Sequence, residues 1–191
     1  MYENVISADI QDMFTRKTHR KYIVKHGRGQ TAAEQNDAMK GAKHMDYRHE
    51  IKHIISPGDA AAIRANLSAV AKLDAHAAAR GCYDIRSLYF DDPLDTALHE
   101  KLDGVNERRK FRIRYYNDDL SYIMLECKMK RDGVGYKLQE RLTQDEVTRI
   151  LSGDIAWLVT SNRPLLAMLY VEMKVNRLMP KTVVAYQRVP F

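Results

Sequence analysis

Cysteine is scarce in this chain, and its scarcity excludes two kinds of site. The chain has two cysteines, Cys82 and Cys127, which are too few for the disulfide framework of a small secreted domain and lack the spacing of a metal site. Long apolar runs are also missing, because no stretch approaches the roughly 18–20 apolar residues of a membrane span. The N-terminus has charges where a signal peptide needs its apolar core. We therefore expect a soluble protein of the cytoplasm without a membrane span.

Acidic residues are outnumbered by basic ones. The 191 residues include 31 Lys and Arg against 25 Asp and Glu, a formal net charge of +6. This balance is compatible with a phosphate-rich partner, but many soluble proteins share it and bind no polyanion. The arrangement of the cations is therefore more informative than their number.

One stretch, Lys110–Tyr116, concentrates this charge. Because side chains alternate between the two faces of a β-strand, its cations share one face and its apolar residues share the other. The cations are Lys110, Arg112 and Arg114, and the apolar residues are Phe111, Ile113 and Tyr115. Like charges in a row repel each other unless water or an anion screens them. The pattern is thus typical of either a solvated outer face or a polyanion site.

The same alternation recurs in three other segments, Arg48–Lys52, Leu125–Lys130 and Val184–Arg188. In the second of these it separates Leu125, Cys127 and Met129 from Glu126, Lys128 and Lys130. Several strands with a basic or mixed-charge face favour a sheet curled around a polyanion site. Like charges crowded on one face do not hold a sheet together, so we expect that converting both Arg112 and Arg114 to Ala strongly weakens phosphate binding and leaves the fold nearly intact.

The chain divides into a basic N-terminal extension over 1–43, expected to be poorly ordered or partly helical, and a globular part over 44–191. Helices are predicted over 60–79 (begun by Ser56 and Pro57), near 94–102, over 144–151 and over 164–178. Strands are predicted over 51–55, 83–91, 110–116, 121–130, 136–141 and 181–189, with a hairpin turn at Asn117–Asp119. The short connections indicate antiparallel strands with helices outside, an α+β class.

Taken in order along the chain, these segments resemble the VTC domain, the catalytic module of vacuolar transporter chaperone-type polyphosphate polymerases in the triphosphate tunnel metalloenzyme group. The matching pieces are Tyr47–Lys52, Arg86–Asp91, Lys101–Tyr115, Leu125–Lys128, the helix from Thr143 to Ser152–Gly153, and Tyr186–Phe191. The resemblance covers about 45–191.

The resemblance implies an antiparallel β-barrel that encloses a tunnel lined by Lys and Arg, with helices packed outside. Such a tunnel would hold ATP or another nucleoside triphosphate and polyphosphate. The implied activity is polyphosphate polymerase-type phosphoryl transfer, with Mn or Mg as the divalent metal. The phosphate-binding residues that the resemblance implies are Lys52, Arg112, Arg114, Lys128, Lys130, Lys137, Tyr186 and Arg188.

The opening strand favours one branch of this group. The related adenylate cyclase and thiamine triphosphatase branch resembles Glu-x-Glu-x-Lys here, with two carboxylates for metal, whereas Arg48, Glu50 and Lys52 give Arg-x-Glu-x-Lys. The family continues past the Tyr186–Phe191 segment with another Arg-bearing strand and a strand whose Glu binds the metal. We therefore expect a C-terminally incomplete domain with an open or incomplete barrel, in which Glu50 and Glu126 are candidate metal ligands.

Two other functions stay open. A catalytically inactive module, or a truncated fragment, would bind polyphosphate without transferring a phosphoryl group. In a nucleic-acid-binding sheet, Tyr115, Tyr116 and Tyr122 would stack on bases beside the arginines. A role as ordinary sheet aromatics explains these tyrosines better, so we do not expect nucleic acid as the partner. The sequence leaves the nucleotide preference and the oligomeric state open.

Overall fold

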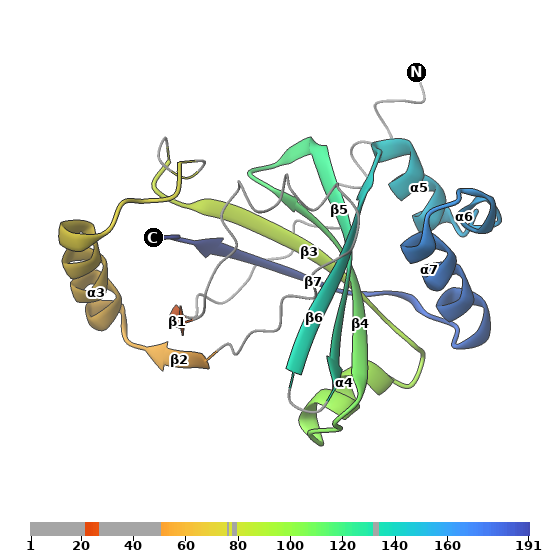
Figure 1. The fold of residues 1–191 in the computed structure, drawn as a ribbon, viewed down its shortest axis with the longest axis horizontal. Coiled ribbons are helices and arrows are strands. Elements are labelled where there is room, and N and C mark those ends of the chain that lie inside the picture. Colours follow the sequence, from red (N-terminus) through yellow and green to blue (C-terminus); the bar gives the residue numbers. More distant parts are fainter. Residues whose placement is uncertain (1–21, 27–50, 76, 78–79, 132–133) are drawn as a thin grey trace.

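The computed structural model describes residues 22–26, 51–75, 77, 80–131 and 134–191. These residues form a five-stranded antiparallel sheet with helices on one face, and a separate two-stranded sheet (Figure 1). The α+β class expected from the sequence is confirmed.

The five-stranded sheet has the order β6-β5-β4-β3-β7. Its strands are β3 (Tyr83–Asp91), β4 (Arg108–Tyr116), β5 (Asp119–Arg131), β6 (Val134–Leu142) and β7 (Met179–Arg188). Every neighbouring pair is antiparallel. In the described part of the chain, β6 and β7 are the two edges and no further strand joins them. The sheet is therefore open, in agreement with the expected open or incomplete barrel, and it is not the closed barrel that the family resemblance implies.

The β4–β5 connection is the tight hairpin that the sequence predicts. Tyr116 pairs with Asp119, so the loop consists of Asn117 and Asp118, whose φ angles are 53° and 58°. Positive φ at both central positions is the geometry of a type I′ turn, whose twist matches that of the two strands. Asn and Asp tolerate this conformation better than most residues. Between this turn and the charged residues the pairing shifts, between Arg114 and Tyr116, so the turn and this irregularity together set the register in which Arg112 lies opposite Glu126.

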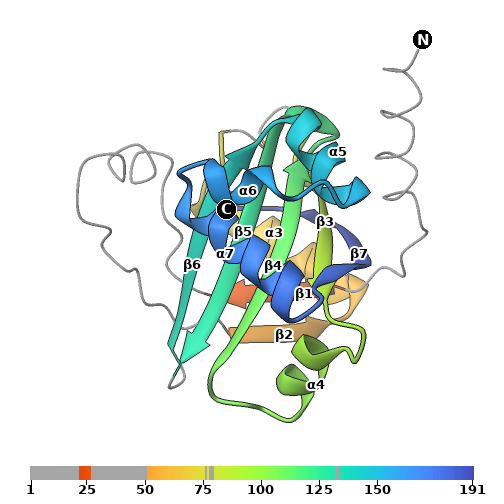
Figure 2. The same cartoon turned by 90° about the vertical axis from the view of Figure 1, so that its right-hand side faces the viewer.

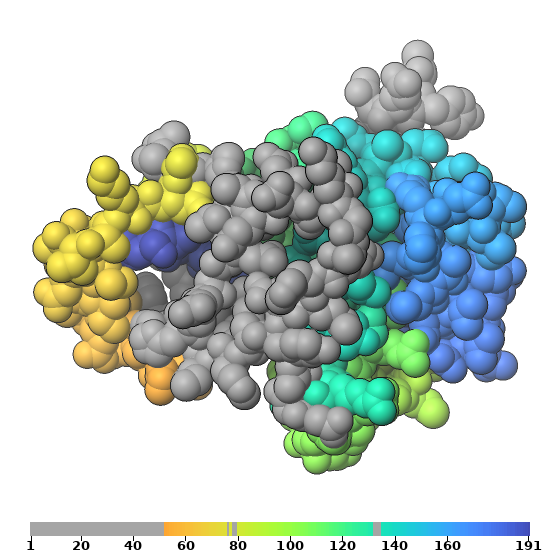
Figure 3. Space-filling view, viewed as in Figure 1, coloured from red at the N-terminus to blue at the C-terminus, as the bar shows by residue number. Residues whose placement is uncertain are grey.

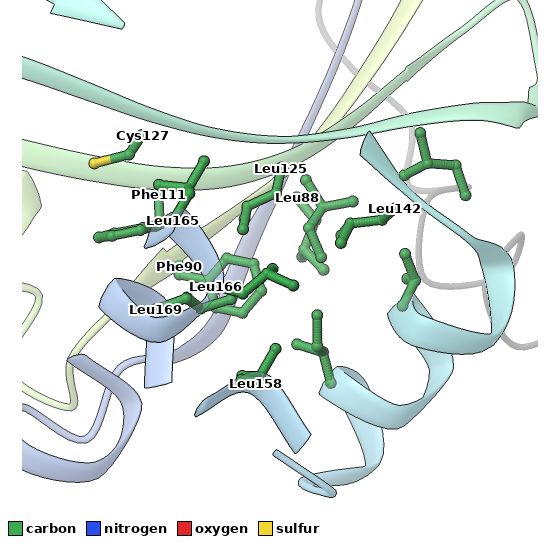
Figure 4. Close-up of a cluster of buried hydrophobic side chains, with 14 of the residues drawn as sticks. Leu88, Phe90, Phe111, Leu125, Cys127, Leu142, Leu158, Leu165, Leu166 and Leu169 are labelled. Atoms are coloured by element: carbon green, nitrogen blue, oxygen red, sulfur yellow. The ribbon is translucent and has the colours of Figure 1, made fainter. Parts of the chain in front are cut away.

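Three helices cover one face of the sheet: α5 (Gln144–Ser152), α6 (Trp157–Thr160) and α7 (Pro164–Val175). Figure 2 shows them in front of the strands. Between them lies the core, in which apolar side chains of β3, β4 and β5 meet those of the helices (Figure 4). The residues of this core labelled in the figure are Leu88, Phe90, Phe111, Leu125, Cys127, Leu142, Leu158, Leu165, Leu166 and Leu169.

Local signals explain where these helices begin and end. Thr143 caps α5, and its side chain accepts a hydrogen bond from the Glu146 amide while the Glu146 carboxylate accepts one from the Thr143 amide. This reciprocal pair is the capping box predicted from the sequence. Gly153 ends the helix in the left-handed region, at φ 83°. Helix α7 stops at Val175, before the predicted Leu178, and the short α6 was not predicted.

Helix α3 (Pro57–Val70) begins as predicted but is shorter. Ser56 accepts a hydrogen bond from the Asp59 amide at 3.1 Å, which confirms the expected cap. The predicted continuation to Ala79 is wrong, because tertiary contacts take over the following segment. The amide of Asp74 donates to the Pro190 carbonyl at 3.2 Å, and the Asp74 carboxylate accepts a hydrogen bond from the Tyr83 hydroxyl.

Strands β1 (Tyr22–His26) and β2 (Ile51–Ile55) form the two-stranded antiparallel sheet. In register, Tyr22 pairs with Ile55 and His26 with Ile51. Helix α3 follows β2 directly and lies at the end of the molecule opposite α5, α6 and α7 (Figures 1 and 3). The remaining residues of the N-terminal extension lie outside the described part of the chain, so its division from the globular part stays a prediction.

A short helix, α4 (Thr96–Leu102), connects β3 to β4 in the region where the sequence predicts one. The carboxylate of Asp91, at the end of β3, accepts hydrogen bonds from the amides of Ala97 and Leu98 at 2.9 and 3.1 Å. The sheet thereby holds the start of α4 in place. Among the described residues, none of the helices is long and apolar enough to cross a membrane.

Candidate functional site

The face of the sheet opposite the helices carries the cations that the sequence groups together on β4. Phe111, Ile113 and Tyr115 of β4 are buried in the core, so Lys110, Arg112 and Arg114 lie on the other face, as the alternation predicts. The strands β3, β5, β6 and β7 add polar residues to this face according to their register. We call it the cationic face, defined by Ser87, Tyr89, Arg108, Lys110, Arg112, Arg114, Glu126, Lys128, Lys130, Lys137, Tyr186 and Arg188.

The register aligns cations with cations at one end of this face. Lys110 lies opposite Lys128, which lies opposite Lys137 on the next strand, and Arg108 lies opposite Lys130. Like charges directly across a strand pair are destabilising. Burial, together with the charges of Lys101 and Arg108, lowers the pKa of Lys110. This end of the cationic face is therefore suited to an anion that screens the repulsion.

Arg112 is held in place by contacts from both neighbouring strands. Its Nε donates to Glu126 Oε2 at 2.6 Å, and its Nη2 forms an ion pair with the same oxygen. On the other side, its Nη1 donates to the Tyr89 hydroxyl at 2.7 Å. The guanidinium carbon lies 5.6 Å from the centre of the Tyr89 ring. The orientation of Arg112 is therefore fixed within the sheet.

Arg114 is more deeply buried, with 7% of the residue exposed. Its Nε donates to Ser87 Oγ at 2.9 Å, and its Nη2 donates to the Tyr186 hydroxyl at 3.4 Å. Its Nη1 lies 3.8 Å from Glu126 Oε2. Strands β3, β5 and β7 therefore all contribute a group to one guanidinium.

Glu126 is a buried carboxylate at the centre of these cations. It is 3% exposed, lies opposite Arg112 in register, and also pairs with Lys137 Nζ at 3.4 Å. Burial opposes its ionisation, but Arg112, Lys137 and Arg114 together outweigh burial and lower the pKa of Glu126. Arg112 and Arg114 are thus partners of a buried carboxylate. This finding speaks against the expectation that the fold stays nearly intact when both arginines are replaced.

Comparison with models of known protein families shows to which family this chain belongs. The family model of the VTC domain matches residues 47–191. The chain belongs to the VTC-domain family. No curated protein matches the chain.

The family implies a divalent metal, and the described residues of this VTC domain do not fit one. Divalent Mg²⁺ or Mn²⁺ needs oxygen ligands, chiefly carboxylates. The carboxylate of Glu126 is already surrounded by Arg112, Arg114 and Lys137. No group of three or more His, Cys, Asp or Glu that could hold a metal occurs within the described ranges. The other candidate ligand, Glu50, lies outside those ranges.

The structure brings most of the expected phosphate-binding residues of the VTC domain onto one sheet. Arg112, Arg114, Lys128, Lys130, Lys137, Tyr186 and Arg188 all belong to the five-stranded sheet. Lys52 does not, because it lies on β2 in the two-stranded sheet, where it pairs in register with Lys25. Arg188 lies at the far end of β7, opposite Tyr83, and is exposed.

Two hydroxyl residues, Ser87 and Tyr89, orient the two arginines and were not predicted from the sequence. Both alternate with the core residues Leu88 and Phe90 along β3. The alternation of apolar and polar residues, which places the cations of β4 on one face, also places these two hydroxyls of β3 on the cationic face. Their hydrogen-bond partners, however, depend on the pairing of β3 with β4, which the sequence does not reveal.

Proposed function

We propose that the cationic face binds the phosphate chain of ATP, another nucleoside triphosphate or polyphosphate. The observation that carries this proposal is the arrangement of Arg112 and Arg114 beside three lysines of β5 and β6. Membership of the VTC-domain family supports it. The aligned cations at the Lys110 end support it as well, because an anion would relieve their mutual repulsion.

The two kinds of cation would contribute differently. The planar guanidinium of arginine suits two-point contact with phosphate oxygens, whereas lysine supplies a movable point charge. Arg112 and Arg114 are oriented by hydroxyls and by Glu126, so their geometry is set before a ligand arrives. Lys128 and Lys137 are exposed and can adjust to the ligand. Fixed and adjustable donors together suit a flexible chain of phosphates.

Beyond phosphate binding, we propose a more specific function, phosphoryl transfer of the polyphosphate polymerase type. Such transfer depends mainly on positioning and on electrostatic stabilisation of the equatorial oxygens. The cationic face would supply both to a bound triphosphate. We therefore assign binding and orientation of the phosphate chain to this face, and the proposal of transfer rests on membership of the family.

A nucleic-acid-binding sheet is less well supported. It would need Tyr115, Tyr116 and Tyr122 to present their rings together to successive bases. Tyr115 is instead buried in the core, on the side of the helices. Tyr116 makes an edge contact with Tyr83, with ring centres 6.1 Å apart. The three rings therefore form no common stacking surface.

A thermal-shift titration with tripolyphosphate at low salt tests the proposed function. A ligand that binds the folded state alone raises the Tm by mass action. We expect the Tm to rise with tripolyphosphate and with ATP, and an oligonucleotide to compete poorly for the same site. No change in Tm at millimolar tripolyphosphate would contradict the proposal. Displacement of tripolyphosphate by low concentrations of oligonucleotide would favour nucleic acid instead.

A further inference from the structure

Glu126 occupies the position on the cationic face where an anionic ligand would be expected. We propose that Glu126 is an internal counter-ion that a phosphate ligand displaces from Arg112, so that this one carboxylate sets the affinity of the face. The inference rests on the proposed phosphate binding and adds the residue that regulates it.

The hydrogen bonds of Arg112 show what a ligand would have to replace. The guanidinium presents its donors in a rigid fork. The edge formed by Nε and Nη2 faces Glu126, and Nη1 faces the Tyr89 hydroxyl. The edge best suited to two-point contact with a phosphate is therefore taken by the carboxylate. A phosphate can use that edge when Glu126 leaves it.

The surroundings of Glu126 allow this exchange. Its other oxygen, Oε1, lies 3.4 Å from Lys137 Nζ, and Oε2 lies 3.8 Å from Arg114 Nη1. Both distances are longer than a good charge-assisted hydrogen bond, so these contacts can shorten when Glu126 leaves Arg112. Lys137 is the most exposed of the three cations, with 38% of its side chain accessible. Glu126 would thus keep cationic partners after the exchange.

Glu126 then has opposite effects on the stability of the fold and on the affinity for phosphate. In the unliganded protein it stabilises the buried Arg114 and the partly buried Arg112, because a charge removed from water without a partner is strongly unfavourable. Toward a phosphate it acts as a competing anion, and it also repels the ligand. Removing its charge while keeping its shape should lower the stability of the fold and raise the affinity for phosphate. A purely structural role would lower both.

The test compares Glu126→Gln with Glu140→Gln by isothermal titration calorimetry with tripolyphosphate, at equal ionic strength. Glu140 lies on β6 opposite Leu125, on the side of the helices, and pairs with Arg163. Both variants remove one negative charge, so Glu140→Gln controls for the change in net charge. We expect about tenfold tighter binding for Glu126→Gln, with a lower Tm, and unchanged affinity for the control.

Unchanged or weaker binding by folded Glu126→Gln would overturn the inference, provided that the wild-type chain binds tripolyphosphate. If the wild-type chain does not bind, the proposed function itself fails. A second measurement needs no substitution, because NMR can follow the side-chain carboxyl ¹³C resonance of Glu126 in the wild-type protein. We expect this resonance to shift on saturation with tripolyphosphate, and a resonance that does not move would also overturn the inference.

Discussion

Arg114 on β4 lies directly opposite Ser87 on β3, and its Nε donates a hydrogen bond to Ser87 Oγ at 2.9 Å. Both residues are buried, at 7% and 0% exposure. A small hydroxyl residue in the middle of a strand thus supplies an acceptor to a buried cation. This contact between β3 and β4 therefore holds in place an arginine of the face that we propose to bind phosphate.

The first prediction concerns this hydroxyl. Ser87→Ala should reduce the free energy of unfolding by about 1–3 kcal/mol, because Arg114 Nε loses its acceptor in a buried site. Urea unfolding measures the change. Ser68→Ala is the matched control, since its hydroxyl donates to the Arg64 carbonyl on the exposed helix α3. A Ser87→Ala variant as stable as this control would show that the hydrogen bond contributes nothing.

The second prediction concerns the pair formed by Arg112 and Glu126. Arg112→Ala alone should cost about 3–5 kcal/mol of stability, because it leaves a buried carboxylate with weaker partners. Adding Glu126→Gln to this variant should restore part of the loss. A double-mutant cycle in chemical denaturation measures the coupling. Additive effects of the two substitutions would contradict a direct interaction in solution.

The third prediction is a pH dependence of stability. Because Arg112, Lys137 and Arg114 lower the pKa of Glu126 below its ordinary value of 4.5, the ionised carboxylate stabilises the folded state. This contribution is fully present above the unfolded-state pKa and is lost as the pH falls through the lower folded-state value. Tm measured between pH 3 and pH 6, about the range of carboxylate titration, should fall less steeply for Glu126→Gln than for the wild type. Equal slopes would contradict the ionised, paired state of Glu126.

The fourth prediction tests which face of β5 points into the core. Burial raises the pKa of the Cys127 thiol to about 12, whereas Cys82 is partly accessible. At pH 8 a thiol reagent should therefore modify Cys82 in the folded protein, and Cys127 after unfolding. Cys82→Ser should remove the fast reaction. A fast reaction that persists in this variant would mean that Cys127, and with it the Leu125–Met129 face, is accessible.

Much of the sheet was predictable because local chemistry determines it. The alternation in Lys110–Tyr116 assigned both faces of β4, and the Asn117–Asp118 pair specified the hairpin turn. The capping residues at Ser56 and Thr143 marked two helix starts. In each case the deciding interaction lies within a few residues along the chain.

The remaining features depend on contacts between distant segments. Helix α3 ends early, before the segment in which the Asp74 amide donates to the carbonyl of Pro190, a residue far away in the sequence. Glu126 on a charged strand face is compatible with solvation or with burial, and its cross-strand contact with Arg112 decides between them. Sequence alternation therefore identified the cationic face but could not show that an internal carboxylate neutralises part of it.

The central claim is that this face binds a chain of phosphates, and isothermal titration calorimetry with tripolyphosphate tests it most directly. The informative variant is Lys128→Met with Lys137→Met, which removes two exposed cations from the face. Its control is Lys72→Met with Lys174→Met, which removes two exposed lysines outside the five-stranded sheet. We predict saturable binding by the wild type, binding weakened at least about tenfold in the face variant, and little change in the control. Absence of saturable binding by the wild type, or equal binding by the two variants, would contradict the account.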